Sequence, residues 1–539
     1  MRELIESVGA LPLKERKALA VLLKQKGINL FAVAPIFKRD PAEPLQLSYA
    51  QERQWFLWQL DPGSTAYHIP VALRLRGALD VPALERAFQG VVARHEALRT
   101  TLLEGPQGAL QQIHESWPVA LRAEPFEGLP GLDLEASLSA RIEAETQQLF
   151  DLAQGPLFRL RLWQLDESDH ALVLTLHHIV ADGWSMQVMV DELTRLYGEH
   201  AHGQPANLPP LSIQYADYAL WQRHWMEAGE RERQQAFWLE QLGGEQPVLA
   251  LPLDYPRPAE QRFEGARLDL QVPAELSERL LALAQVHGVT PFMLLLASFQ
   301  LLLHRHSGQA DIRVGVPVAN RNRVETEGLI GFFVNTQVLK AEVDGQLRFD
   351  QFLSDTRQQV LAAQAHQDLP FEQLVEVLQP ERNLSYSPLF QVLFNHKGAP
   401  ASTAGPASQG PLRIEQLSWR SQSAQFDLAL DTYERVDGLG ASITYATDLF
   451  KPQTAARLGR HWLNLLQAIV AAPQARLCEL PMLDNDERVL LEQFNATTTP
   501  YDLTQTVHGL FEQQVQANPD APALLFGEQQ LSYAELNAR

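Results

Sequence analysis

The sequence is almost free of cysteine: Cys478 is the only one among 539 residues. A single cysteine excludes an intrachain disulfide and any metal cluster that is held by several cysteines. It also fits a reducing compartment, and we expect a cytoplasmic protein. The first residues, Met1 to Glu6, lack a basic region followed by an apolar core, so no signal peptide is predicted.

Basic residues are scarce as well. The chain has 44 lysines and arginines against 65 aspartates and glutamates, which gives a net charge of −21. This excess of negative charge argues against binding to nucleic acid or to anionic membranes, because both need a basic surface. No run reaches the ~18 apolar residues that a membrane-spanning helix needs. With 45% hydrophobic and 20% charged residues over 539 positions, we expect a folded protein of two or more domains.

Apolar residues recur with two different periods along the chain. Alternation and short apolar runs predict strands at 71–75, 157–163, 171–176, 312–318, 331–339, 389–394, 426–430 and 442–445. Spacing of three and four residues predicts helices at 81–95, 215–241, 292–304, 352–367 and 452–471. Because strands and helices mix throughout, the predicted fold class is α/β or α+β.

One short stretch, residues 176–185, reads Leu-His-His-Ile-Val-Ala-Asp-Gly-Trp-Ser. The apolar run Ala171–Leu176 predicts a buried strand, and the apolar spacing after the stretch predicts an amphipathic helix with Ser185 as its N-cap. Two histidines, an aspartate and a glycine therefore lie on a loop between a rigid strand and the N-terminus of a helix. Polar side chains at such a junction can be held in place and oriented toward a ligand.

This stretch contains the pattern His-His-x-x-x-Asp-Gly, which resembles the signature of the condensation domains of nonribosomal peptide synthetases. Further segments resemble the other motifs of that family and occur in the family's order, at 48–57, 94–100, 215–221, 330–336, 366–372 and 387–391. Chance agreement over all of them is negligible, so residues from about 47 to 475 are identified as a member of this family. Residues 506–539 resemble the opening of an adenylation domain, whose first motif is similar to Leu531–Leu536. As a whole, the chain is similar to synthetases of pyoverdine-type siderophores.

The resemblance implies a fold and a set of domain boundaries. Two lobes, each similar to chloramphenicol acetyltransferase, would form a V with the active site in a tunnel at their junction. We expect a helical docking segment and linker at 1–45, the two lobes at 46–213 and 214–475, a linker at 476–505, and the start of a truncated adenylation domain at 506–539.

The resemblance also implies a reaction. An acceptor amine would attack a donor thioester, with both substrates carried on the phosphopantetheine arms of carrier proteins. Because a thioester is already activated, no bound cofactor and no metal are expected. His178 is the expected catalytic residue, since a neutral imidazole accepts a hydrogen bond or a proton from the amine; whether it acts as a base or orients the amine stays open. The Gly183 N–H, near a helix N-terminus, is expected to face the oxyanion.

Asp182 has two interpretations. It is either a second acid or base, or a buried structural anion, and we favour the anion with Arg321 as its partner. His177 is expected to hold the loop through hydrogen bonds. A zinc site formed by His177, His178 and Asp182 is disfavoured, because adjacent histidines rarely present both rings to one ion.

Three more residues are expected to support the site. Ser185 is expected to form hydrogen bonds within the loop, and Trp184 stands beside it in the motif. Asn335 either faces the tunnel or caps the end of a strand. None of these three is expected to take part in the bond changes.

Two alternatives to amide formation stay open. An epimerisation domain keeps the same His-His-x-x-x-Asp-Gly pattern, and a non-catalytic relative would only recruit partner proteins. The intact pair of His177 and His178 argues against such degenerate relatives, and against cyclisation domains, in which aspartate replaces the first histidine.

Carrier proteins are the expected partners. The donor, expected to be L-configured, would arrive on the carrier of a separate upstream protein, while the acceptor carrier and the adenylation domain would follow in the same chain. Residues 3–26 predict short helices that either dock the upstream protein or pack on the next domain. We expect a monomer.

Overall fold

The structure, a computed structural model, describes residue 11 and residues 13–24, 26, 29–106, 108–381, 383–398, 412–417, 423–435, 437–500, 502 and 504–539. The chain divides into two compact units, residues 1–482 and residues 483–539. The first unit contains both expected lobes. Of the expected docking segment, residues 3–10, 12 and 25 lie outside the described residues, and Leu13–Lys24 form helix α2.

The first lobe is built on a five-stranded sheet with the order β11-β1-β6-β5-β4. Its strands are β1 (His68–Arg76), β4 (Ala123–Pro125), β5 (Phe158–Asp166), β6 (Asp169–His177) and β11 (Arg413–Gln416). Neighbouring strands are antiparallel, except that β4 and β5 are parallel. Because β11 comes from the second half of the sequence, one edge of this sheet is supplied by residues far from the rest of it.

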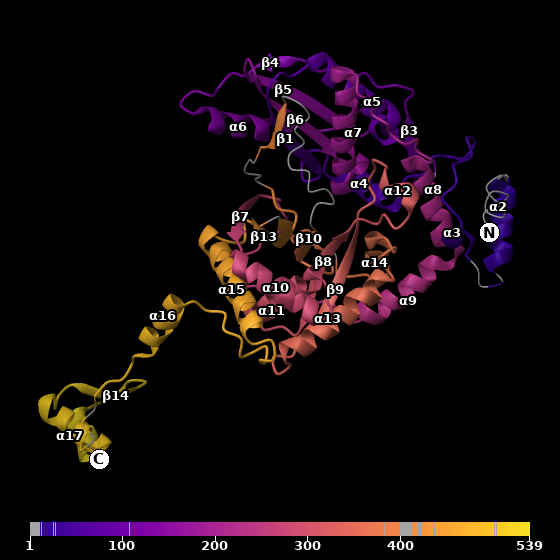
Figure 1. Cartoon of the computed structure of the whole chain (residues 1–539). Helices are drawn as coiled ribbons and strands as arrows, with labels where there is room; N and C mark the ends of the chain where they lie inside the picture. Colours follow the sequence, from indigo (N-terminus) through magenta and orange to yellow (C-terminus); the bar gives the residue numbers. More distant parts are fainter. Residues whose placement is uncertain are drawn as a thin grey trace. The chain divides into compact units, whose positions relative to one another are not determined.

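Strand β6 is buried along almost its whole length because both faces of the sheet are covered. On one face, Leu172, Leu174 and Leu176 pack against α5 (Val81–Arg94) and α7 (Gly183–His202). On the other face, Ala171 and Val173 pack against α6 (Leu134–Thr146). Figure 1 shows α5 and α7 lying together over this sheet. Covering on both faces explains why the sequence of β6 is an apolar run rather than an alternating one.

The second lobe contains a six-stranded sheet with the order β7-β13-β12-β10-β8-β9. Its strands are β7 (Gly265–Gln271), β8 (Asp311–Val318), β9 (Asn335–Glu342), β10 (Val392–Lys397), β12 (Leu428–Arg435) and β13 (Gly438–Ala446). Strand β10 is parallel to both of its neighbours, and the other pairs are antiparallel. Four helices pack on this sheet and on one another: α10 (Ala274–Val286), α11 (Pro291–Ser307), α13 (Phe349–Gln364) and α15 (Pro452–Ala471).

Helix α11 is the central helix of the second lobe. Every residue from Met293 to Leu303 is buried, which is the expected place for a helix that is apolar all round. Among the described residues, no single helix has the length and hydropathy of a membrane span; α10 and α11 reach that level only as a pair, across a bend of 106°.

The predicted long helix at 215–241 is interrupted. It consists of α8 (Tyr215–Trp225), a π-helical turn (Met226–Glu230) and α9 (Arg231–Leu242). Gly229 has φ 108° in this turn, a backbone conformation that favours glycine. The break was not predicted, because the residues on both sides of it are favourable in a helix and a single glycine is tolerated there.

The predicted strand at 331–339 begins later, at Asn335. The preceding backbone does not pair with a neighbouring strand. Instead, Gly331 N–H donates to Ser185 Oγ at 3.1 Å and Phe333 N–H donates to Asp182 Oδ2 at 3.0 Å. Side chains of the first lobe thus satisfy these backbone groups and end the strand early.

The remaining elements of the first unit are short. They are α3 (Leu30–Val33), α4 (Tyr49–Leu60), a 3-10 turn (Glu96–Arg99), the hairpin β2 (Thr100–Gly105) and β3 (Gly108–Ile113), a 3-10 turn (His178–Val180), α12 (Val324–Glu327) and α14 (Phe371–Leu378). Of these, α4 and α14 carry residues that reach the junction of the two lobes.

The second unit contains α16 (Asn485–Asn495), α17 (Val507–Ala517), the hairpin β14 (Pro522–Phe526) and β15 (Gln529–Ser532), and α18 (Tyr533–Ala538). The expected linker at 476–505 therefore includes a helix. Asp484 and Glu487 start that helix with reciprocal side-chain to backbone hydrogen bonds, a pattern that stabilises a helix N-terminus.

Candidate functional site

His178 follows β6 directly and begins the 3-10 turn, where its ring is partly buried. Its Nδ1 lies 3.1 Å from the carbonyl oxygen of Ala181, which can only accept, so Nδ1 carries the proton. Nε2 is then unprotonated in the neutral ring. Among the described residues it has no hydrogen-bond partner. The turn therefore presents the free lone pair of an imidazole whose other nitrogen is fixed.

Burial lowers the pKa of His178 below its ordinary value of 6.5. The negative charge of Asp182 and the hydrogen bond to Ala181 raise this pKa, while the positive charge of Arg53 lowers it further. Since the net effect is downward, the imidazole is neutral at pH 7. The ring of Phe332, centred 5.1 Å from the ring of His178, contributes to the apolar surroundings.

Asp182 is fully buried at the N-cap of α7. Its Oδ1 accepts from the Ser185 backbone N–H at 2.8 Å and lies 3.1 Å from Nη2 of Arg321, so the predicted ion pair is present. Its Oδ2 accepts from the Phe333 N–H at 3.0 Å. With both oxygens engaged in this way, the carboxylate is placed to hold the loop rather than to exchange protons with a substrate.

Arg321 connects the second lobe to the catalytic loop. Its side chain is almost fully buried and donates from Nη1 to the carbonyl oxygens of Thr326 and Leu329, at 2.6 and 2.7 Å. The guanidinium carbon lies 4.0 Å from the centre of the Phe333 ring. The same side chain thus fixes the loop of its own lobe and neutralises the buried charge of Asp182.

Ser185 joins the two lobes through its hydroxyl. The Oγ atom lies 2.7 Å from Asp182 Oδ1 and 2.8 Å from the carbonyl oxygen of Gly331, and it accepts from Arg321 Nη2 at 2.8 Å. The prediction that Ser185 caps α7 is wrong. Asp182 is the N-cap, because its carboxylate accepts the N–H of Ser185, the third residue of the helix.

Gly183 and Trp184 form the first two positions of α7. Gly183 is exposed, and a Cβ atom built on it would meet no atom within 4 Å, so a ligand can approach its backbone closely. The helix N-terminus carries partial positive charge at this point. The Trp184 side chain is 42% exposed and donates from Nε1 to the carbonyl oxygen of Glu327 at 2.9 Å, a further contact between the lobes.

His177 and Asn335 hold neighbouring backbone. His177 is buried, and its Nδ1 accepts from the N–H of Ile179 at 3.1 Å. Asn335, the first residue of β9, donates to the carbonyl oxygens of Gln367 and Leu369, at 2.9 and 2.7 Å. It also lines a small pocket at the junction, while a placement facing a tunnel stays a prediction.

Tyr215 is a residue of the site that sequence reasoning missed. It is fully buried, and its hydroxyl donates to the carbonyl oxygen of Phe332 at 2.5 Å and lies 2.7 Å from Ser48 Oγ. A Cβ atom on Gly331 would lie 2.0 Å from the Tyr215 ring, so only glycine fits there. These contacts fix the backbone that places Phe332 beside His178. Ser48, Tyr215 and Phe332 lie in segments that resemble other motifs of the family. That resemblance was the sequence feature that could have pointed to them.

Arg53 and Glu372 were also missed. Arg53 of α4 and Glu372 of α14 face each other across the junction, 3.3 Å apart. With Asn320, Phe332 and other residues, they line a pocket of about 10 Å³, which has room for about one water molecule. The ion pair therefore fills the space between the lobes close to Phe332.

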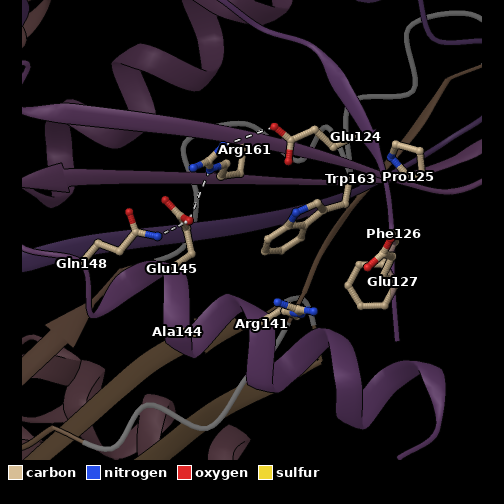
Figure 2. Close-up of a pocket in the computed structure, with 10 residues that line it drawn as sticks. All are labelled: Glu124, Pro125, Phe126, Glu127, Arg141, Ala144, Glu145, Gln148, Arg161 and Trp163. Atoms are coloured by element: carbon tan, nitrogen blue, oxygen red, sulfur yellow. Dashed lines mark hydrogen bonds and ion pairs between the residues drawn. The ribbon is translucent and has the colours of Figure 1, made fainter. Parts of the chain in front are cut away.

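A larger pocket, of about 380 Å³, lies between α6 and the edge formed by β4 and β5. Figure 2 shows Trp163 in the middle of this pocket, with Arg161 reaching both Glu124 and Glu145. None of the predicted site residues lines it. The side chains that the sequence singled out meet instead at the junction of the two lobes.

Comparison with known proteins gives one family. A sequence model described as Condensation domain matches residues 42–492. One of the linear gramicidin synthase proteins of Brevibacillus parabrevis is 41% identical over 544 residues, which cover 100% of this chain and 7% of that protein. Malpibaldin synthetase of Mortierella alpina is 41% identical over 505 residues, which cover 92% of this chain and 9% of that protein. The chain thus spans only a small part of the length of these curated relatives.

Solved structures show the same fold. The X-domain from teicoplanin biosynthesis superposes with a TM-score of 0.75 at 31% identity, over 83% of this chain and 99% of that chain. A four-domain nonribosomal peptide synthetase bound to AMP and glycine superposes with a TM-score of 0.74 at 25% identity, over 92% of this chain and 38% of that chain. The predicted mixed α/β fold with chloramphenicol-acetyltransferase-like lobes is confirmed.

Proposed function

The chain belongs to the condensation domains of nonribosomal peptide synthetases, and we propose that it forms an amide bond between a donor aminoacyl or peptidyl thioester and the amine of an acceptor aminoacyl thioester. One observation carries the proposal: the neutral His178 has a free Nε2, while its Nδ1 is fixed by Ala181. A group of this kind can accept a hydrogen bond or a proton from an amine without any metal or bound cofactor.

In the proposed reaction, the acceptor nitrogen attacks the donor carbonyl carbon. The new C–N bond forms, the C–S bond breaks, and one proton moves from the nitrogen to the departing thiolate. His178 Nε2 orients the amine and conveys that proton, while the Gly183 N–H at the start of α7 stabilises the oxyanion. Holding both substrates in the reactive geometry lowers the barrier by about 7–11 kcal/mol, the largest contribution expected here.

The rigid frame around His178 supports this role. Asp182, Arg321 and Ser185 fasten the start of α7 to the second lobe through buried hydrogen bonds. Catalysis by positioning needs a site that is held within a fraction of an ångström. The proposed site therefore uses charged residues for geometry and leaves the proton transfer to one imidazole.

The lowered pKa of His178 gives a testable pH dependence. The neutral form is the active one, and it is lost only as the pH falls through a pKa below 6.5. We therefore expect the part of the pH dependence that comes from His178 to appear only below pH 6.5. Initial rates with loaded carriers between about pH 5 and 8 would show this limb.

A control separates this limb from the ionisation of the substrate. The acceptor amine also has to be neutral, so its own pKa adds a second limb. Acceptors whose amines differ in pKa should shift that limb and leave the His178 limb in place. A limb of the pH profile that does not move with the pKa of the acceptor amine and has its midpoint above pH 6.5 would contradict the assigned environment of His178.

We propose that partners deliver both substrates on phosphopantetheine arms. The acceptor carrier and an adenylation domain would be joined to this chain, and residues 506–539 would be the opening of that adenylation domain. The similarity of Leu531–Leu536 to the first adenylation motif supports this assignment. A pyoverdine-type siderophore remains the predicted product class, and a cytoplasmic monomer the predicted state.

We propose that the donor carrier belongs to a separate protein that docks on the N-terminal segment. Helix α2 packs on the first unit through Ala20 and Leu23, as one of the two expectations had it, and its opposite side supports docking, because Val21 and Leu22 are 59% and 60% exposed. Deleting residues 1–28 should weaken transfer from a separate donor carrier, seen as a raised KM for that carrier. Transfer from a donor carrier fused to the chain should stay unchanged. Equal effects on both donors would contradict a docking role.

The direct test of the proposed function is product analysis. The chain is mixed with a donor carrier and an acceptor carrier, each loaded with a known amino acid. The masses of both carriers are then measured by intact-mass spectrometry. Amide formation transfers the donor mass to the acceptor carrier. Parallel reactions with L- and D-configured donors test the predicted preference for the L-form. No transfer with either donor would overturn the proposal.

A further inference from the structure

A further pocket in the first unit lies beside the junction and has no role in the reaction proposed above. Its volume is about 260 Å³, and it lies between α8, the segment after β8 and the segment before α14. Its lining includes Tyr218, Trp221, Trp225, Asn320, Arg323 and Asp368. Gln222 and Asn320 also line the small pocket near Phe332, so the two spaces are neighbours.

Asp368 is a largely buried carboxylate without a cationic partner. Its Oδ2 lies 3.3 Å from Gln234 Nε2 and its Oδ1 lies 3.4 Å from Asn322 Nδ2, both long for hydrogen bonds. Among the described residues it forms no ion pair. Burial and the nearby charge of Glu230 raise its pKa to about 6. Buried charges are normally paired, so a cation bound beside this carboxylate would stabilise its charged form.

The cations near Asp368 are already committed to other groups. Arg323 donates to the carbonyl oxygens of Phe31 and Ala32, at 3.0 and 2.6 Å. Arg233 lies 2.6 Å from Glu230 and holds that carboxylate with several hydrogen bonds. Neither guanidinium therefore forms an ion pair with Asp368 among the described residues, although the charge of Arg233 lowers the pKa of Asp368 in part.

The lining also contains three aromatic side chains, and the guanidinium carbon of Arg323 lies 5.2 Å from the centre of the Trp221 ring. The rings of Trp221 and Trp225 stack with centres 4.8 Å apart. The buried Nε1 of Trp225 has no hydrogen-bond partner among the described residues. The Tyr218 hydroxyl lies 3.2 Å from Asn320 Nδ2 and brings a third ring to the pocket. Aromatic rings attract cations and also pack against alkyl chains.

We propose that this pocket binds a primary alkylammonium group, with the ammonium on Asp368 and the alkyl chain against Trp225 and Tyr218. The charge of Asp368, the aromatic walls and the volume all fit such a ligand. Two sources share this chemistry: the amine-bearing side chain of an acceptor aminoacyl group, or a free aliphatic diamine. The first source rests on the proposed function, whereas the second does not.

Binding of n-butylammonium to the full chain tests the pocket without any carrier. We expect saturable binding, measured by isothermal titration calorimetry and by a change in tryptophan fluorescence, and no binding of neutral 1-butanol. Asp368→Asn should weaken the binding by about tenfold or more, because a charged contact is lost. Glu376→Gln removes the same charge from the exposed face of α14 and should have no effect.

Two further measurements keep the proposal falsifiable if Asp368→Asn does not fold. Butylammonium binding to the unmodified chain should weaken as the pH falls below about 6, where Asp368 is protonated. Glu230, Arg233, Tyr218 and Arg323 are the other ionisable groups near this carboxylate, and none of the arginines loses its charge in that range. Trp225→Leu should weaken binding while leaving Asp368 in place.

Further experiments distinguish the two sources of the ligand, and they separate a failure of this proposal from a failure of the proposed function. The variant His178→Ala should bind butylammonium as the unmodified chain does, so a failure of amide formation leaves this test intact. If acceptors provide the ligand, an acceptor with an amine-bearing side chain should have a lower KM than its neutral isostere, and 1,4-diaminobutane should compete with it. If a free diamine is the ligand, the two acceptors should behave alike. The absence of saturable butylammonium binding, or equal binding by Asp368→Asn, would overturn the proposal.

Discussion

Replacing His178 with alanine is expected to lower the rate of amide formation by about 10²–10⁴-fold, the usual contribution of a positioned acid or base. The alanine variant loses the free Nε2 of the His178 imidazole, while the bonds of Asp182 to Arg321 and Ser185 stay in place. Intact-mass analysis of the acceptor carrier over time measures the rate. The affinity for both carriers should change little, because the side chain lies inside the junction.

The same experiment separates the alternatives. A module that only recruits partner proteins would give no product with either chain, so His178→Ala would change nothing. An epimerisation domain would invert a carrier-bound residue without transferring mass, which chiral analysis of the released acid detects. His200→Ala, on the same helix α7 and away from the junction, is the matched control and should retain activity. An unchanged rate in His178→Ala would remove His178 from the proposed mechanism.

Replacing Arg321 with alanine is expected to destabilise the chain by about 3–5 kcal/mol, the usual cost of leaving one partner of a buried ion pair alone. Asp182 is 0% exposed and would lose its cationic partner. The carbonyl oxygens of Thr326 and Leu329 would also lose their donor. Equilibrium denaturation followed by tryptophan fluorescence and circular dichroism measures the change in the free energy of unfolding.

A matched arginine on the surface provides the control. Arg195 pairs with Asp191 on α7 at 3.0 Å, and both side chains are about half exposed. Arg195→Ala should therefore change the free energy of unfolding by less than about 1 kcal/mol. The double variant Arg321→Leu with Asp182→Asn removes both buried charges and should recover part of the lost stability. Equal stability of Arg321→Ala and Arg195→Ala would show that the buried pair contributes nothing net.

The central strand, loop and helix could be predicted from the sequence because their signals are local. The apolar run of β6 ends at His177, and the three- and four-residue spacing of α7 begins a few residues later. His178 has to lie in the short connection between them. The pairing of Asp182 with Arg321, 139 positions apart, has no local signal, and it was predicted only through the resemblance to a family.

Other parts of the site depend on packing that a single sequence does not reveal. Gly331 and Phe332 read as part of a strand, because their apolar character does not show that Tyr215 and Ser185 would bind their backbone. The unpaired state of Asp368 is likewise a property of distant neighbours. The N-cap of α7 was misplaced for a simpler reason: aspartate and serine both cap helices, and only the geometry decides between them.

The position of β11 matters for anyone who recombines synthetase modules. Residues 413–416 complete the sheet whose other strands come from residues 68–177, pairing Leu75 with Ile414 and Arg74 with Glu415. A chimera joined near residue 213 would take β1 from one parent and β11 from another, and a fragment ending there would expose an unpaired strand edge that favours aggregation. The two halves of the condensation domain therefore have to come from the same parent when modules are exchanged.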